Sequence, residues 1–181
     1  MESLKGKLLL ASPTLFDPNF RRTVVLITEH NEEGAAGLVL NRRSETPVIE
    51  AVPDLVPLVS DDERVYVGGP VQQSAVLVLA EFDDPGDAAM LVVDDVGFVP
   101  GEGDFGLLAA ATRRVRVFAG YAGWGAGQLE AELEESSWFV EAPDGLDLFP
   151  EEDTDLWGAV LRRKGGVYRV VALMPEDPSL N

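Results

Sequence analysis

Short apolar runs dominate the first 100 residues of this chain. Such runs, rich in β-branched residues and bounded by Gly, Pro, Asn and Asp, predict strands. The predicted strands lie in Lys5–Ser12, Thr23–His30, Gly34–Arg42, Arg64–Gly69, Ser74–Phe82 and Ala89–Val99. Three residues separate the second run from the third, so these two are expected to form a hairpin. Prolines interrupt the segment Thr46–Ser60, which predicts one or two short helical turns there.

Helical patterns enter later in the chain. Asp104 is a candidate N-cap for a helix that runs to Arg114, and strand patterns follow in Arg113–Gly123 and Trp138–Pro143. Gly127–Ser137 and Asp153–Gly166 have the apolar spacing of amphipathic helices. Strands first and helices mostly afterwards favour an α+β fold over a doubly wound sheet. The expected core contains Val24–Ile27, Leu38–Leu40, Val65, Val67, Val115, Val117, Leu129, Leu133 and Trp157.

The length of 181 residues fits one domain over residues 1–181. The chain has no cysteine, which excludes disulfides and thiolate chemistry. Its N-terminal apolar run, Leu8–Ala11, is too short for a signal peptide, and no run approaches a membrane span. We therefore expect a cytoplasmic protein without membrane contact.

The net charge of −18 is the strongest global feature, because 32 acidic residues face 14 basic ones. Binding to the DNA backbone requires cations that displace counterions, so no tight direct nucleic-acid binding is expected. The acidity is consistent with a solvated surface, a basic protein partner or a salty cell. The arginines cluster in pairs and triplets, and a local basic patch would form if folding gathered two of these groups.

The stretch Gly120–Gln128 combines a strand end, glycines and a helix start, the setting in which helix N-termini bind phosphate. Gly123, Gly125 and Gly127 have the spacing G-x-G-x-G, which is one residue shorter than the G-x-G-x-x-G motif of dinucleotide-binding proteins. Glu130 in the first helical turn would repel a phosphate. We favour a structural junction at which Trp124 covers the contact of strand and helix.

His30 is the single histidine. A lone histidine acts as a general base only with a partner and a pocket, and Ser12 and Asp17 are candidate partners. A hydrogen-bonded structural role is favoured. With one imidazole and no thiolate, no metal site and no cofactor are expected.

Three segments and the end of the chain together resemble a single protein family. They are GKLLLASPTLFDPNFRRTVVLITEHNEEGAAGLVLNR, VGGPV, GYAGWGAGQLEAEL and the terminal PSLN. These closely resemble the YqgE/AlgH family of bacterial proteins, from about Gly6 to Asn181. The resemblance implies a single compact α+β domain with a mostly antiparallel, barrel-like sheet and several packed helices. One branch of that family is named for a transcriptional regulator of alginate production, and the resemblance implies no catalytic residues.

Two functional hypotheses follow. The first is a non-enzymatic cytoplasmic regulator that acts through a protein partner, with its oligomeric state open. The second is a small-molecule binder or an enzyme whose site lies in the loops around Asp17, His30, Gly68 and Trp124. The candidate functional surface for either contains Asp17, Asn19, His30, Asn41, Gly68, Gly69, Pro70, Tyr121, Trp124 and Gln128.

Overall fold

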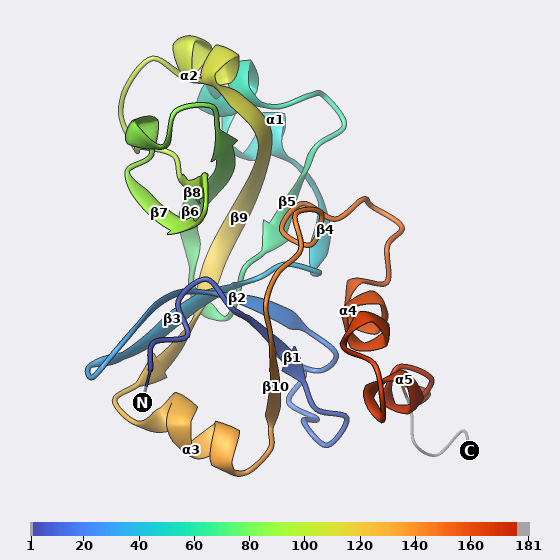
Figure 1. The fold of residues 1–181 in the computed structure, drawn as a ribbon. Helices are drawn as coiled ribbons and strands as arrows, with labels where there is room; N and C mark the ends of the chain where they lie inside the picture. Colours follow the sequence, from blue (N-terminus) through green and yellow to red (C-terminus); the bar gives the residue numbers. More distant parts are fainter. Residues whose placement is uncertain (1, 177–181) are drawn as a thin grey trace. The chain divides into compact units, whose positions relative to one another are not determined.

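A computed structural model describes residues 2–176 of the chain. The chain divides into two compact units (Figure 1). Met1–Asn41 and Gly123–Asn181 make up the first unit, and Arg42–Ala122 make up the second. One domain spanning residues 1–181 stays a prediction.

The first unit is built on an antiparallel sheet with the strand order β10-β1-β2-β3. Its strands are β1 (Leu8–Ala11), β2 (Val24–Asn31), β3 (Gly34–Val39) and β10 (Trp138–Glu141). The expected hairpin is confirmed, because β2 and β3 pair directly on either side of a short turn. Residues Leu8–Ala11 and Val24–Ile27 are fully buried. Strands covered on both faces read as continuous apolar runs, which explains these two segments.

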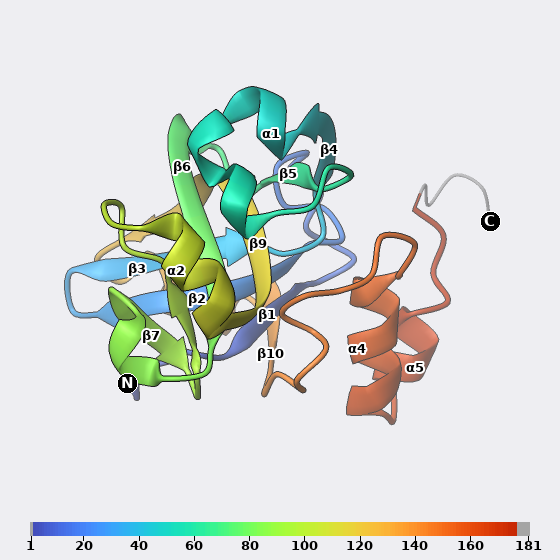
Figure 2. The same cartoon turned by 90° about the horizontal axis from the view of Figure 1, so that it is seen from above.

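Three helices complete the first unit: α3 (Gln128–Glu134), α4 (Leu156–Lys164) and α5 (Tyr168–Val171). The Asp155 carboxylate accepts a hydrogen bond from the Gly158 N–H and caps α4. Helix α4 buries Trp157, Val160 and Leu161, as its apolar spacing predicts. Helix α5 lies beside α4 (Figures 1 and 2). Sequence patterns did not predict α5, because its β-branched residues favour a strand.

The second unit has a six-stranded sheet with the order β4-β5-β9-β6-β8-β7. Its strands are β4 (Arg43–Pro47), β5 (Arg64–Val67), β6 (Val71–Phe82), β7 (Met90–Val93), β8 (Val96–Phe98) and β9 (Thr112–Gly125), whose last three residues belong to the first unit. All pairs are antiparallel except β5 with β9. The α+β class and the mostly antiparallel sheet are therefore confirmed. The expected barrel-like sheet is not a closed barrel, because among the described strands β10 pairs only with β1 and β7 only with β8.

The short helices of the second unit are α1 (Val48–Ala51), α2 (Phe105–Ala111) and the 3-10 turns η1 (Pro53–Leu58) and η2 (Pro85–Asp87). Helix α1 and η1 confirm the short helical turns expected in the proline-broken segment. Asp104 caps α2 as predicted, since its carboxylate accepts hydrogen bonds from the N–H groups of Gly106 and Leu107. Helix α2 lies beside η1 (Figure 2).

Two details of the predicted core are wrong in strand β5. Val67 is 36% exposed, although the expected core includes it, and Tyr66 is buried, although the expected core omits it. The Tyr66 ring packs 6.0 Å from that of Phe118 and lies 4.4 Å under the Arg116 guanidinium. Contacts with a second ring and with a guanidinium stabilise a buried aromatic ring. The alternation of inward and outward residues along a strand does not take these contacts into account. The remaining expected core residues are buried, except Val115 and Leu133, which are half-buried.

The glycine-rich stretch is also more extended than expected. Strand β9 continues through Gly125, so the turn is confined to Ala126 and Gly127. Gly127 has a φ of 74°, in the left-handed region that glycine adopts readily, and it precedes α3. A Cβ at Gly125 would meet only the Gln128 side-chain oxygen, at 4.0 Å, and a Cβ at Gly127 would meet nothing within 4 Å. Of these two glycines, only Gly127 is therefore required, by its backbone conformation.

Candidate functional sites

His30 is held by hydrogen bonds on both ring nitrogens. Its Nδ1 accepts from the Leu4 N–H at 3.0 Å, so in the neutral ring Nε2 carries the proton. Nε2 lies 2.6 Å from Oε1 of Glu130, and the His30 side chain is 3% exposed. The hydrogen bond from His30 is the main cause that lowers the pKa of Glu130. His30 is hydrogen-bonded as expected, and its side-chain partner is Glu130 rather than Ser12 or Asp17.

The loop between β1 and β2 is closed by side-chain hydrogen bonds to backbone. Asp17 Oδ1 accepts from the Asn19 N–H at 2.9 Å, which forms an Asx turn. Asn41 accepts from the Val24 N–H at 3.0 Å through Oδ1, and its Nδ2 donates to the Arg22 carbonyl at 2.9 Å. Asn41 therefore ties the end of this loop to the end of the β2–β3 hairpin.

The glycine-rich junction centres on two buried indoles. Trp124 and Trp138 are 6% and 4% exposed. Both indole Nε1–H groups donate to the same oxygen of Glu132, at 2.6 and 3.3 Å. The two indoles meet edge to face with centroids 6.0 Å apart, and the Phe20 ring packs against both. The expectation of a structural junction, with the Trp124 N–H directed to a partner, is confirmed.

The start of α3 is closed rather than open to a ligand. The Gln128 side-chain oxygen accepts from the Gly125 N–H at 3.0 Å. Glu130 places a carboxylate in the first turn. Both features disfavour a phosphate at this helix end.

In the second unit, the Gly68–Gly69–Pro70 segment packs tightly on β9. The Gly68 N–H donates to the Ala119 carbonyl at 2.9 Å. A Cβ on Gly69 would lie 2.1 Å from the Tyr121 carbonyl carbon, so only glycine fits this position. Close backbone approach therefore accounts for the glycine pair.

The ten residues of the predicted surface divide between the units. Asp17, Asn19, His30, Asn41, Trp124 and Gln128 belong to the first unit, and Gly68, Gly69, Pro70 and Tyr121 belong to the second. Their joint role as one functional surface stays a prediction.

The second unit contains an apolar hollow that sequence reasoning missed. We call it the η1–β6 hollow; its volume is about 340 Å³. It is lined by Val52, Asp54, Leu55, Val76, Leu77, Val78, Phe98, Val99, Pro100, Gly101 and Phe105. Pockets that hold ligands have about 300–1,000 Å³ and mostly apolar walls with few polar groups. The hollow meets both conditions, with Asp54 as the one ionisable side chain among the described lining residues.

Large apolar side chains are exposed on the elements that line this hollow. Val76 is 44% exposed on β6, Val56 is 51% exposed beside Leu55, and Leu107 is 71% exposed on α2. Helix α2 has no fully buried residue. The segment before α2 adds two exposed carboxylates, Glu102 and Asp104, and contains two glycines. The elements that line the hollow therefore carry both exposed apolar side chains and exposed carboxylates.

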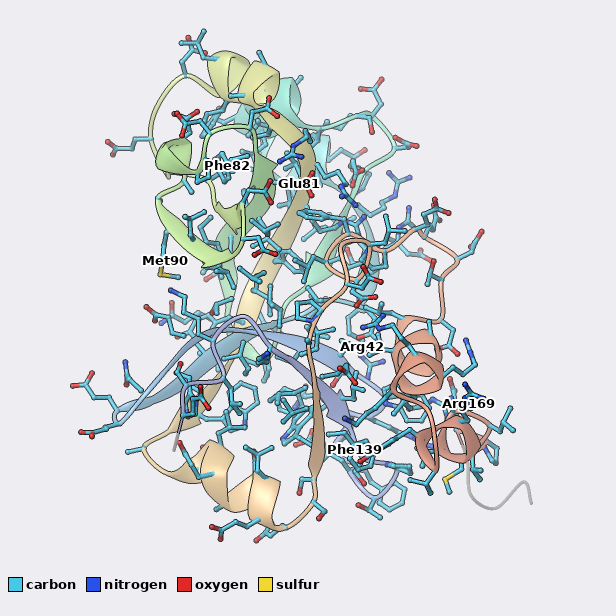
Figure 3. All side chains as sticks on the ribbon, viewed as in Figure 1. Arg42, Glu81, Phe82, Met90, Phe139 and Arg169 are labelled. Carbon is cyan, nitrogen blue, oxygen red and sulfur yellow. The ribbon has the colours of Figure 1, made fainter. Side chains whose placement is uncertain are left out.

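The arginines at the start of β9 do not form an open basic patch. Arg113 pairs with Glu81 at 3.3 Å, with Asp83 at 3.2 Å and with Asp95. Arg114 pairs with Glu81 at 2.9 Å; Figure 3 labels Glu81 at the end of β6. Carboxylates therefore neutralise this arginine group.

The hollow could not be read from apolar patterns. Each lining segment was recognised as a strand or a helical turn, but a void depends on how Phe98 and Phe105 fill the space around Val76. The one sequence feature that could have indicated the hollow is the apolar Val76, which follows exposed polar residues on the same strand.

Within residues 2–176, no group of three or more His, Asp or Glu side chains is arranged to hold a metal ion. No helix in the same range is long and apolar enough to cross a membrane.

The fold and sequence together define an AlgH-like protein. The AlgH-like family model matches residues 8–169. The chain therefore belongs to the AlgH-like family, which confirms the resemblance stated above.

Relatives and solved structures agree with this assignment. A UPF0301 protein of Streptomyces coelicolor is 44% identical over 190 residues, covering 100% of this chain and 97% of the relative. A UPF0301 protein of Chlorobaculum tepidum is 44% identical, covering 97% and 95%. The solution structure of the AlgH protein from Pseudomonas aeruginosa has a TM-score of 0.73 at 31% identity, covering 96% and 95%. The crystal structure of protein DIP2367 from Corynebacterium diphtheriae has a TM-score of 0.87 at 30% identity, covering 96% and 93%.

Proposed function

We propose that this AlgH-like protein is a cytoplasmic regulator that acts by binding a protein partner, and that the η1–β6 hollow is its docking site. The observation that carries the proposal is an apolar hollow of about 340 Å³ whose lining includes one carboxylate. The proposed occupant is a basic, amphipathic helical segment of the partner.

The shape and lining of the hollow support a helical segment. Amphipathic helices bind by placing apolar side chains at i, i+3, i+4 and i+7 into an apolar groove. The exposed Val56, Val76 and Leu107 would extend the contact beyond the hollow itself. One or two large apolar side chains of the partner would fill the hollow as anchors.

Charge supports a basic partner. The chain has a net charge of −18, and Asp54, Glu102 and Asp104 lie in the segments that form the hollow. Complementary charge accelerates association and selects among partners more than it adds affinity. The same net charge opposes tight binding to DNA, and the ion pairs of Arg113 and Arg114 remove one group of cations that duplex DNA would need.

The second hypothesis, a small-molecule site around Asp17, His30, Gly68 and Trp124, has less support. In the first unit, Asp17, His30 and the Trp124 indole are engaged in internal hydrogen bonds. We therefore favour the protein partner.

The test uses the full chain and a synthetic helical peptide of about 14 residues, with Leu at i, i+3, i+4 and i+7 and Lys elsewhere. Binding is measured by fluorescence anisotropy at two salt concentrations. We expect a Kd of about 10 μM that weakens with salt. Val76→Glu should weaken binding at least about tenfold, because it places a charge at the apolar contact.

Two controls make the test specific. Val167→Glu, at a valine of the first unit that is even more exposed than Val76, should leave the Kd within about twofold. A scrambled peptide of the same composition should bind at least about tenfold more weakly, because it lacks an apolar face. Equal binding of the two peptides, or unchanged binding by Val76→Glu, would reject the hollow as the docking site.

A further inference from the structure

The loop between β1 and β2 lines a second, smaller pocket, which the proposed function does not use. This pocket, here the Arg22 pocket, lies within the first unit and has a volume of about 130 Å³. Pro13, Leu15, Phe16, Trp157 and Met174 form its apolar walls. Arg21, Arg22, Ser12 and Glu176 supply its polar groups, and Pro175 completes the lining.

Arg22 is fixed in place by its surroundings. Its guanidinium lies 4.1 Å from the centroid of the Trp157 ring, and Nη1 donates to the Met174 carbonyl at 2.8 Å. Trp157 is itself fully buried, with its Nε1–H bonded to the Ala11 carbonyl at 2.9 Å. A guanidinium stacked on a rigid indole loses little freedom when it binds an anion.

The backbone of Arg22 is strained. Its φ is 54°, in the left-handed region that residues other than Gly, Asn and Asp seldom adopt. The Asn41 side chain holds this conformation by donating to the Arg22 carbonyl at 2.9 Å. Such strain persists where the surrounding structure enforces it, and it concentrates at sites that position a side chain for function.

We propose that the Arg22 pocket binds a small monocarboxylate with an apolar, ring-sized body. A guanidinium has five N–H donors in a planar fork that matches a carboxylate. The Nη1 bond to Met174 uses one of them, and no other hydrogen bond of this side chain occurs among residues 2–176. The volume of about 130 Å³ is close to that of a cavity of about 150 Å³ that binds benzene.

The walls favour a carboxylate with an apolar body over inorganic phosphate. Phe16 lines the pocket and is 57% exposed, so the apolar body of a bound carboxylate would cover part of its ring. Glu176 lies in the lining and is solvent-exposed, so its charge would repel a phosphate dianion more than a carboxylate. The proposal is independent of the η1–β6 hollow, which belongs to the other unit.

The test uses benzoate as the probe, with benzamide as its uncharged isostere and inorganic phosphate as the bare anion. Binding to the full chain is followed by NMR of the Trp157 indole N–H, assigned by a Trp157→Phe variant. We expect benzoate to shift this signal with a Kd of about 1 mM, a reasonable affinity for so small a ligand. Benzamide should bind at least about tenfold more weakly, and phosphate should not displace benzoate.

Three variants decide the role of Arg22. Arg22→Lys keeps the charge but lacks the planar fork, and should weaken benzoate binding about tenfold. Arg22→Gly relieves the backbone strain, so it should keep or raise the melting temperature while it abolishes binding. Glu176→Gln should bind benzoate as well as the native chain or up to about threefold tighter.

Equal shifts by benzoate and benzamide would overturn the proposal, because the guanidinium would then contribute nothing. Native affinity in Arg22→Lys would overturn it for the same reason. Phosphate binding in place of benzoate would show an inorganic-anion site and would also reject the proposed carboxylate.

Discussion

Two helices of seven residues, one in each unit, differ in almost every respect that matters for function. Helix α3 buries Leu129 to 1% exposure and is linked to its surroundings by Glu130 and Glu132. Helix α2 has no fully buried residue and exposes Leu107 at 71%. Short helices have little stability of their own and depend on packing. Helix α3 has that packing, whereas α2 borders a hollow.

The two helices also differ in whether the side chains around them already have interaction partners. At the α3 junction, two indole N–H groups, a histidine ring and a glutamine side chain have partners inside the unit. At the η1–β6 hollow, apolar side chains face empty space. A partner can add contacts at the hollow without breaking any, but at the α3 junction it would first have to break hydrogen bonds. This contrast supports the proposal that a partner binds at the hollow, whereas the junction stabilises the first unit.

The largest expected effect is at Trp124. Trp124→Ala should lower the free energy of unfolding by about 3–5 kcal/mol, because it empties a buried aromatic site. It also leaves Glu132 with one indole donor instead of two. Chemical denaturation gives the value. A loss below about 1 kcal/mol would mean that the junction is not a packing centre.

The two helices can be compared directly by truncating one leucine in each. Leu129→Ala on α3 should cost about 2–5 kcal/mol. Leu107→Ala on α2 should change stability by less than about 0.5 kcal/mol, since the side chain is largely exposed. The same denaturation experiment measures both variants. Similar losses at the two positions would contradict the contrast between the helices.

The N-cap of α2 offers a smaller effect. Asp104→Ala removes the carboxylate that bonds the N–H groups of Gly106 and Leu107, and should cost about 1 kcal/mol. Because α2 is weakly packed, the loss should appear as faster amide exchange in α2. Protection in β6, measured by hydrogen exchange, should stay unchanged. Uniform loss of protection in both elements would show that α2 and its sheet unfold together.

The smallest effect depends on pH. The hydrogen bond from His30 lowers the pKa of Glu130 from its ordinary value of 4.5, so the ionised carboxylate stabilises the fold above that pH. This contribution is lost as the pH falls through the lowered pKa. Wild type should therefore melt above Glu130→Gln at neutral pH, with a gap that closes in acid. A gap independent of pH from neutrality down to pH 3 would show that Glu130 acts only by packing.

Much of the fold follows from local patterns. The buried runs of β1 and β2, the hairpin to β3, the cap at Asp104 and the apolar face of α4 were all predicted from spacing and capping rules. The failures have tertiary causes. Tyr66 is buried because an arginine and a phenylalanine cover its ring, and α5 forms although its sequence favours a strand.

The candidate site was less predictable. Sequence reasoning identified His30 and Trp124 as notable and expected both side chains to be hydrogen-bonded, and both are. It did not find Glu130 or Glu132 as their partners, because 100 residues separate His30 from Glu130. The η1–β6 hollow depends on what packing leaves empty, and no residue pattern encodes that.

The most direct test of the docking site is methyl NMR on the full chain, labelled at Val and Leu and titrated with the amphipathic basic peptide. The hollow predicts that the largest shifts fall on Val52, Leu55, Val76 and Leu107. Signals of Val167, Val170 and Leu173, which are more exposed than Val76 but belong to the first unit, should stay in place. Shifts concentrated on those three residues, or spread evenly over both units, would contradict the account.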